Sequence, residues 1–98
     1  MQIKMVLPYN TDICYYRTNH GAELDVVLTF PQGQRIGVEV KFSSTPKLSR
    51  GNYEAMKDLD IKQLYVIAPI SDRFFLKENV QAMGITEFVK ILKELDNE

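Results

Sequence analysis

The sequence predicts a small α/β domain in which a mixed β-sheet is flanked by helices. Apolar and polar residues alternate with a period of two along residues 23–30 and 35–42, as in strands that are covered on one face. Residues 63–70 are apolar on both faces and follow a helix-like segment, which favours a parallel crossover into the interior of a sheet. The last segment repeats its apolar residues at helical spacing. The expected order of elements is β-β-β-α-β-(β)-α.

The length and charge of the chain limit its domain organisation and its partners. A chain of 98 residues has apolar material for one core, so we expect residues 1–98 to form a single domain. Twelve Lys and Arg against thirteen Asp and Glu give a net charge of −1, so no general basic field attracts nucleic acid or anionic lipid. Any affinity for nucleic acid must therefore come from a local surface.

Cysteine, histidine and hydropathy exclude further classes. Cys14 and His20 are the single residues of their types, so the usual zinc site of cysteines and histidines is excluded. One cysteine fits a protein of the reducing cytoplasm. The longest apolar run, around residues 64–70, is far shorter than the roughly 20 residues that cross a bilayer, so no membrane span is expected.

The first expected strand covers residues 13–18, which are rich in β-branched and aromatic side chains. Cys14, Tyr15 and Tyr16 are expected to pack in the core, because alternating aromatic residues on a strand usually do so. Residues 19–21 supply turn chemistry after this strand.

The next two strands share one arrangement of side chains. In residues 23–30 every even position is apolar and the odd positions are polar, with Val27 as the exception. In residues 35–42 the even positions are apolar and end with Phe42, whereas the odd positions are polar or glycine. We therefore expect two half-buried strands with a common polar face.

A helix and a buried strand are expected next. Ser49 is placed to cap the helix. The apolar stripe of this helix consists of Leu48, Ala55, Met56 and Leu59. Residues 63–70 form the buried strand, and residues 74–76 form a short strand after which the path to Gly84 is undefined.

The last helix has the clearest helical pattern in the chain. Thr86 is expected to be its cap. Its apolar stripe consists of Phe88, Ile91, Leu92 and Leu95. We interpret this stripe as part of the core or, alternatively, as the face of a homodimer.

The polar faces of the second and third strands bring a candidate site together. If the strands pair as a hairpin, Asp25 and Glu39 lie near-opposite, at about 5 Å between their Cβ atoms. Two adjacent carboxylates repel each other unless a cation lies between them, and oxygen ligands of this kind suit Mg²⁺ or Mn²⁺. Lys41 projects to the same face, where its ammonium can orient water or neutralise charge in a phosphoryl transition state. The three residues predict a site for phosphodiester hydrolysis.

Asp25 followed by Glu39-Val40-Lys41 on the next strand resembles the PD-(D/E)XK restriction-endonuclease-like nucleases. The wider string YYRTNHGAELDVVLTF and QRIGVEVKFSSTPKLS is similar to the nuclease-like C-terminal domain of unknown function on predicted AAA-type ATPases of bacteria and archaea. The resemblance implies a restriction-endonuclease-like sheet, Asp25 and Glu39 as metal ligands, and the main-chain carbonyl of Val40 as a third ligand. It further implies that Lys41 is the catalytic lysine.

The chain departs from this family pattern at two places. Leu24 stands where the motif has proline before the aspartate. Few residues precede the first strand and Pro8 interrupts them, so we expect the first core helix of the fold to be absent. The chain also lacks a glycine-rich phosphate-binding loop, so it is expected to be a part of a longer ATPase-type protein or a minimal relative.

Three further residues are secondary candidates for the site. Glu23 lies on the predicted face of Asp25, where it either assists with the metal or is simply exposed. Lys47 and Arg50 lie near the start of the first helix, where they either contact a phosphate backbone or are solvated.

Two functions from different classes follow. The first is a Mg²⁺- or Mn²⁺-dependent nuclease that acts on DNA through Asp25, Glu39 and Lys41. The second is a non-catalytic module that binds nucleic acid or forms a homodimer for an attached AAA-type ATPase. The mildly acidic charge and the expected lack of a first helix favour the second.

Overall fold

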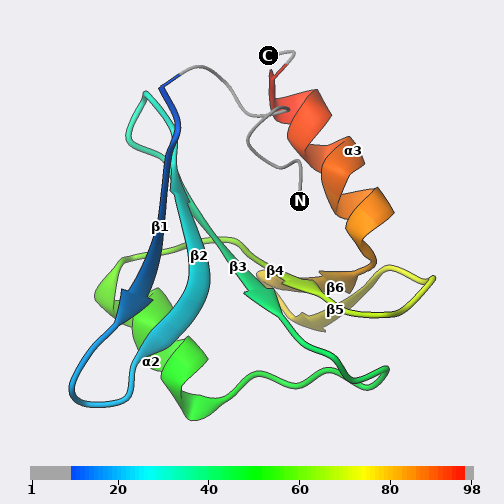
Figure 1. Cartoon of the computed structure of the whole chain (residues 1–98), viewed down its shortest axis with the longest axis horizontal. Coiled ribbons are helices and arrows are strands. Elements are labelled where there is room, and N and C mark those ends of the chain that lie inside the picture. Colours follow the sequence, from blue (N-terminus) through cyan, green and yellow to red (C-terminus); the bar gives the residue numbers. More distant parts are fainter. Residues whose placement is uncertain (1–9, 97–98) are drawn as a thin grey trace.

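One mixed sheet and two helices make up residues 10–96, which are the part of the chain that the computed structural model describes (Figure 1). The strands lie in the order β1-β2-β3-β4-β6-β5. Their bounds are β1 Asp12–Arg17, β2 Glu23–Thr29, β3 Arg35–Val40, β4 Leu64–Ile67, β5 Phe74–Lys77 and β6 Val80–Met83. The helices are α2 Arg50–Asp58 and α3 Ile85–Asp96. The prediction of a small α/β domain with a mixed sheet is confirmed.

The sheet joins an antiparallel half to a parallel centre. Strands β1, β2 and β3 pair antiparallel, and α2 then carries the chain across to β4, which pairs parallel with β3. Strand β6 pairs parallel with β4, and β5 closes the sheet antiparallel to β6. The parallel crossover is therefore confirmed, whereas β6 was not predicted as a strand.

Both faces of the sheet carry apolar side chains. On one face the core gathers Leu28, Phe30, Ile36, Val38, Ile67, Met83, Phe88 and Leu92. On the other it gathers Ala22, Leu24, Val27, Ala55, Ile61, Leu64, Val66, Val80 and Ala82. Helix α3 packs on the first face and helix α2 on the second. The expectation that β2 and β3 are covered on one face only is therefore wrong.

A β-bulge in β2 changes which face its side chains occupy. Cys14 pairs with Val27 and Tyr16 with Leu24, so β2 has one extra residue opposite Tyr15. As a result Leu24 packs on the α2 face, whereas Val26 packs on the α3 face. Val27, the exception in the alternating pattern, lies between Val26 and Leu28 and is buried on the α2 face by ordinary alternation.

Three further expectations about the strands and the last helix are corrected. Phe42 is 92% exposed, because β3 ends at Val40 and no strand within residues 10–96 continues beside Phe42. Cys14 and Tyr15 are exposed rather than core residues, because β1 is an outer strand. Thr86 lies inside the first turn of α3, which begins one residue earlier, so it is not the cap.

The last helix is a core element. Phe88 and Leu92 are fully buried, which confirms the core alternative for these two side chains. The side chain of Leu95 and the expected absence of a first helix before β1 both lie outside what is described. Neither α2 nor α3 is long and apolar enough to cross a membrane.

Helix α2 is held to the sheet by a buried amide at its start. Ser49 caps the helix as predicted, and Asn52 completes a reciprocal capping box with it. Asn52 is fully buried, and its Nδ2 donates to the carbonyl of Glu23 at 3.0 Å. Gly51 permits this approach, because a Cβ there would collide with the carbonyl oxygen of Gly21.

Replacing Asn52 by alanine should therefore lower the free energy of unfolding by roughly 1–3 kcal/mol, since the carbonyl and the helix start both lose a buried partner. Urea denaturation of the variant measures this loss. Lys57→Ala, at an exposed position of the same helix, is the matched control and is expected to change stability by less than about 0.5 kcal/mol. Equal effects of the two variants would contradict a stabilising role for the amide.

Candidate functional site

Strands β2 and β3 lie together at one end and separate at the other (Figure 1). Asp25 and Glu39 bridge the two strands just beyond their last main-chain pair. Main-chain pairing of the two strands extends to Val26 and Val38. Beyond it, the amide of Asp25 donates to Oε1 of Glu39 at 2.9 Å, and the amide of Val40 donates to Oδ2 of Asp25 at 2.8 Å. The two carboxylates thus take positions that main-chain carbonyls occupy elsewhere in the ladder.

The bulge explains why these positions are open to side chains. The amide of Phe30 donates to the carbonyl of Gln34. The main-chain amides and carbonyls of the even residues of β2 therefore point toward β3 as far as Val26. The extra residue of the bulge reverses this direction, so the main-chain groups of Leu24 point toward β1, where Leu24 pairs with Tyr16. The amide of Val40 has then no main-chain acceptor on β2, and the carboxylate of Asp25 replaces it.

Glu39 lies inside the protein and Lys41 partly covers it. Glu39 is 5% exposed, and its Oε2 lies 3.3 Å from Nζ of Lys41. A buried carboxylate is tolerated when it is both paired and hydrogen-bonded, and Glu39 meets both conditions. Asp25 is exposed, so the site opens to solvent on the side of Asp25.

The donor set suits a hard cation that retains water ligands. In the part of the chain that the structure describes, Oδ1 of Asp25 accepts no hydrogen bond, and each oxygen of Glu39 keeps a free lone pair. The carbonyl of Val40, the last residue of β3, is the third ligand that the family resemblance implies. No group of three or more His, Cys, Asp or Glu side chains within residues 10–96 is placed to hold a metal. Two carboxylates and one carbonyl leave several coordination positions for water. Mg²⁺ is commonly bound in this way, because it retains several of its water ligands.

The three secondary candidates lie apart from this set. Oε2 of Glu23 lies 3.0 Å from Nη1 of Arg17, so its carboxylate pairs with β1. Lys47 is exposed in the loop before α2. Nε of Arg50 lies 3.8 Å from Oε1 of Glu54 in an ion pair whose arginine side chain is 92% exposed, and such pairs contribute little to stability.

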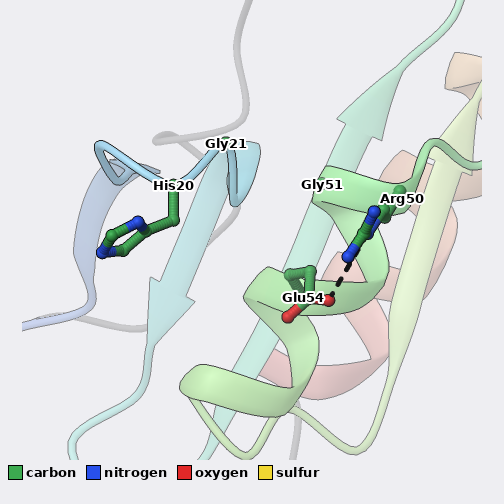
Figure 2. A pocket seen from close by; sticks show the side chains of 5 residues that line it. All are labelled: His20, Gly21, Arg50, Gly51 and Glu54. Carbon is green, nitrogen blue, oxygen red and sulfur yellow. Dashed lines mark ion pairs between the residues drawn. The ribbon is translucent and has the colours of Figure 1, made fainter.

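Arg50 also lines an open hollow of about 410 Å³ between α2 and the turn that joins β1 to β2. Figure 2 shows His20 on this turn, with its imidazole directed away from Arg50, and Glu54 below Arg50 on the helix. Neither Asp25 nor Glu39 lines the hollow, so it is separate from the carboxylate pair.

The model of one protein family, described as a domain of unknown function (DUF4143), matches residues 2–88 of this chain. The chain belongs to this family. The expected resemblance to a domain of unknown function is therefore shown in part. The DUF4143 description names neither a nuclease nor an ATPase.

Two curated relatives of this DUF4143 domain are mycobacterial. They are the uncharacterized proteins Mb2031c of Mycobacterium bovis and Rv2008c of Mycobacterium tuberculosis, each 38% identical over 69 residues, or 70% of this chain. The chain spans about 15% of the length of each of these relatives. No solved structure matches the chain.

Sequence reasoning missed one residue and one irregularity that shape the site. Asn52 ties the start of α2 to the carbonyl of Glu23, two residues before Asp25. An N-cap serine followed by asparagine at the third helical position is a visible signal for the capping box but not for the contact with β2. The bulge beside Asp25 also went unpredicted.

Proposed function

We propose that this DUF4143 domain binds Mg²⁺ or Mn²⁺ between Asp25 and Glu39 and hydrolyses phosphodiester bonds of DNA there. One observation carries the proposal: two carboxylates, fixed by main-chain amides of the facing strands, lie next to a lysine whose Nζ is 3.3 Å from Glu39. Antiparallel strands that carry these residues, followed by a helix and a parallel strand, also support a restriction-endonuclease-like fold.

The residues of the site have distinct tasks in this reaction. Asp25, Glu39 and the carbonyl of Val40 would hold the ion, with Asp25 on the open side where DNA and water enter. When bound, the ion polarises the phosphate and lowers the pKa of a water ligand. Lys41 holds a positive charge beside Glu39, where it orients the attacking water and stabilises the charge that develops on the phosphate oxygens.

Calorimetry with Mn²⁺ and Mg²⁺ tests metal binding directly. Asp25→Asn retains an oxygen that accepts from the Val40 amide but lacks the charge, so we expect binding to weaken at least about tenfold without unfolding. Glu23→Gln is the matched control, because this carboxylate lies on the same strand but pairs with Arg17. It is expected to bind the metal like the wild type.

DNA cleavage in the presence of the same ions tests the reaction. The wild type is expected to cleave, and Glu39→Gln is expected to abolish cleavage while the DNA is still bound. Absence of both metal binding and cleavage in the wild-type chain would overturn the nuclease proposal.

The second candidate is a non-catalytic module that serves an AAA-type ATPase in the cytoplasm. It is favoured by the fact that every observed contact of Asp25 and Glu39 also satisfies a main-chain amide or an ion pair of the fold. For this module, Asp25→Asn leaves binding of DNA or a partner protein unchanged, and added metal has no effect on stability. A loss of DNA binding in that variant would count against it.

A further inference from the structure

Strand β1 is an open and regular edge of the sheet. It is the outermost strand, and no strand within residues 10–96 pairs with its outer side. Its sequence, DICYYR, consists largely of good strand formers and contains no proline, glycine or lysine. The extra residue at the bulge belongs to β2, so β1 itself keeps an unbroken alternation. Such an edge is a template for pairing with another strand.

The opposite edge of the sheet is protected in the ways that proteins commonly use. Strand β5 carries an irregularity between Phe75 and Lys77, where it has one more residue than β6. A charged lysine also lies at its end. The contrast singles out β1 as the edge that is fit for pairing.

The outward hydrogen-bonding groups of β1 belong to its odd residues. The amide of Thr18 donates to the carbonyl of Ala22, so the main-chain amides and carbonyls of the even residues of β1 point toward β2. The amides and carbonyls of Ile13, Tyr15 and Arg17 therefore point away from the sheet. Ile13 is 42% exposed and Tyr15 is 71% exposed, and both side chains lie on the same face of the strand.

These features are self-complementary in one antiparallel register. If two copies meet about a two-fold axis perpendicular to the sheet, each Ile13 lies opposite the Tyr15 of the other copy. Both residues then exchange their outward hydrogen bonds, and both exposed apolar side chains become covered. The register with Tyr15 opposite Tyr15 instead places Ile13 against Arg17, so it covers the apolar surface less well.

We propose that β1 pairs with β1 of a second copy in this register, forming a homodimer with one continuous sheet. This interface involves neither Asp25 nor Glu39, so the inference stands apart from the proposed nuclease function. It also replaces the last helix as the dimer face, because the side chains of Phe88 and Leu92 are buried in the core.

The register makes a specific prediction for Cys14. The two copies of Cys14 face each other at the axis as a non-hydrogen-bonded pair, with Cα atoms about 4.5 Å apart. This separation lies within the range that a disulfide spans. Cys14 is the single cysteine of the chain, so any disulfide-linked dimer of the wild type joins the two Cys14 residues.

Oxidation with copper phenanthroline, followed by non-reducing electrophoresis, tests the register. The matched control carries both Cys14→Ser and Asp12→Cys, which moves the thiol by two residues to another exposed position of β1 and leaves Ile13 and Tyr15 in place. In the proposed register the wild type forms the covalent dimer at least about tenfold faster than the control, because its thiols are already held together. Equal rates, or a faster control, would overturn the register.

Sedimentation of the reduced chain over a range of concentrations tests the dimer itself. The wild type is expected to dimerise, and Ile13→Pro is expected to be monomeric, because it removes an amide that points outward and not one that bonds to β2. Far-ultraviolet circular dichroism checks that this variant remains folded. Phe75→Ala, on the β5 edge, is expected to dimerise like the wild type. A wild-type chain that stays monomeric at every concentration would refute the proposal.

Discussion

Replacing Lys41 by methionine is expected to lower metal-dependent DNA cleavage by about a hundredfold or more, the size of effect seen when a group that stabilises transition-state charge is removed. Metal binding is expected to remain, because the ligands Asp25 and Glu39 are unchanged and the neighbouring positive charge is lost. Single-turnover cleavage and calorimetry with Mn²⁺ measure the two effects separately. A Lys41→Met variant that cleaves at the wild-type rate would show that the lysine has no part in hydrolysis.

The same variant separates a catalytic lysine from a purely structural one. Without Lys41, the buried carboxylate of Glu39 lacks its ion-pair partner, so the metal-free variant should lose roughly 1–3 kcal/mol of unfolding free energy. A cation bound between the carboxylates compensates this charge, and Mn²⁺ should therefore stabilise the variant at least as much as the wild type. If Mn²⁺ stabilises neither protein in thermal denaturation, Lys41 serves only the fold.

The closeness of Asp25 and Glu39 could be predicted from the sequence, but the way they meet could not. Two strands of period two, joined by the short turn at residues 31–33, place the residues near-opposite in a hairpin. A regular hairpin would show both carboxylates on a solvated face. The bulge instead turns β2 toward β1, and helix α2 covers the face that holds Glu39. Val27 was the single sign in β2 that the second face is covered, and nothing in the alternation of apolar residues marks the bulge.

The remaining errors concern strand order and strand ends. Cys14 and Tyr15 have the composition of core residues, but the alternating pattern does not say that β1 lies at the edge. Phe42 continues the alternation of β3, yet β2 has already turned away and β4 ends at Ile67, so neither of the strands that flank β3 extends beside it. Strand β6 has four residues, all buried, which is too short a run to show either period.

Replacing Phe88 by alanine is expected to cost about 3–5 kcal/mol of unfolding free energy, the usual range for a fully buried phenylalanine. Phe88 is 0% exposed, and its ring centroid lies 5.6 Å from that of Tyr65 on β4. It thereby joins α3 to the centre of the sheet. Because a small domain has only about 5–15 kcal/mol of total stability, this variant should be largely unfolded under mild denaturing conditions.

Two companion variants make this result interpretable. Phe88→Leu keeps most of the apolar volume and should cost less than about 1.5 kcal/mol, so it remains folded for urea titration. Lys93→Ala, at an exposed position of the same helix, should change stability by less than about 0.5 kcal/mol. A helix whose apolar stripe formed a dimer interface would behave differently: Phe88→Leu would weaken dimerisation and leave the unfolding of the monomer unchanged. With Phe88 in the core, the order of stability is Lys93→Ala, then Phe88→Leu, then Phe88→Ala, and dimerisation of Phe88→Leu through β1 is retained.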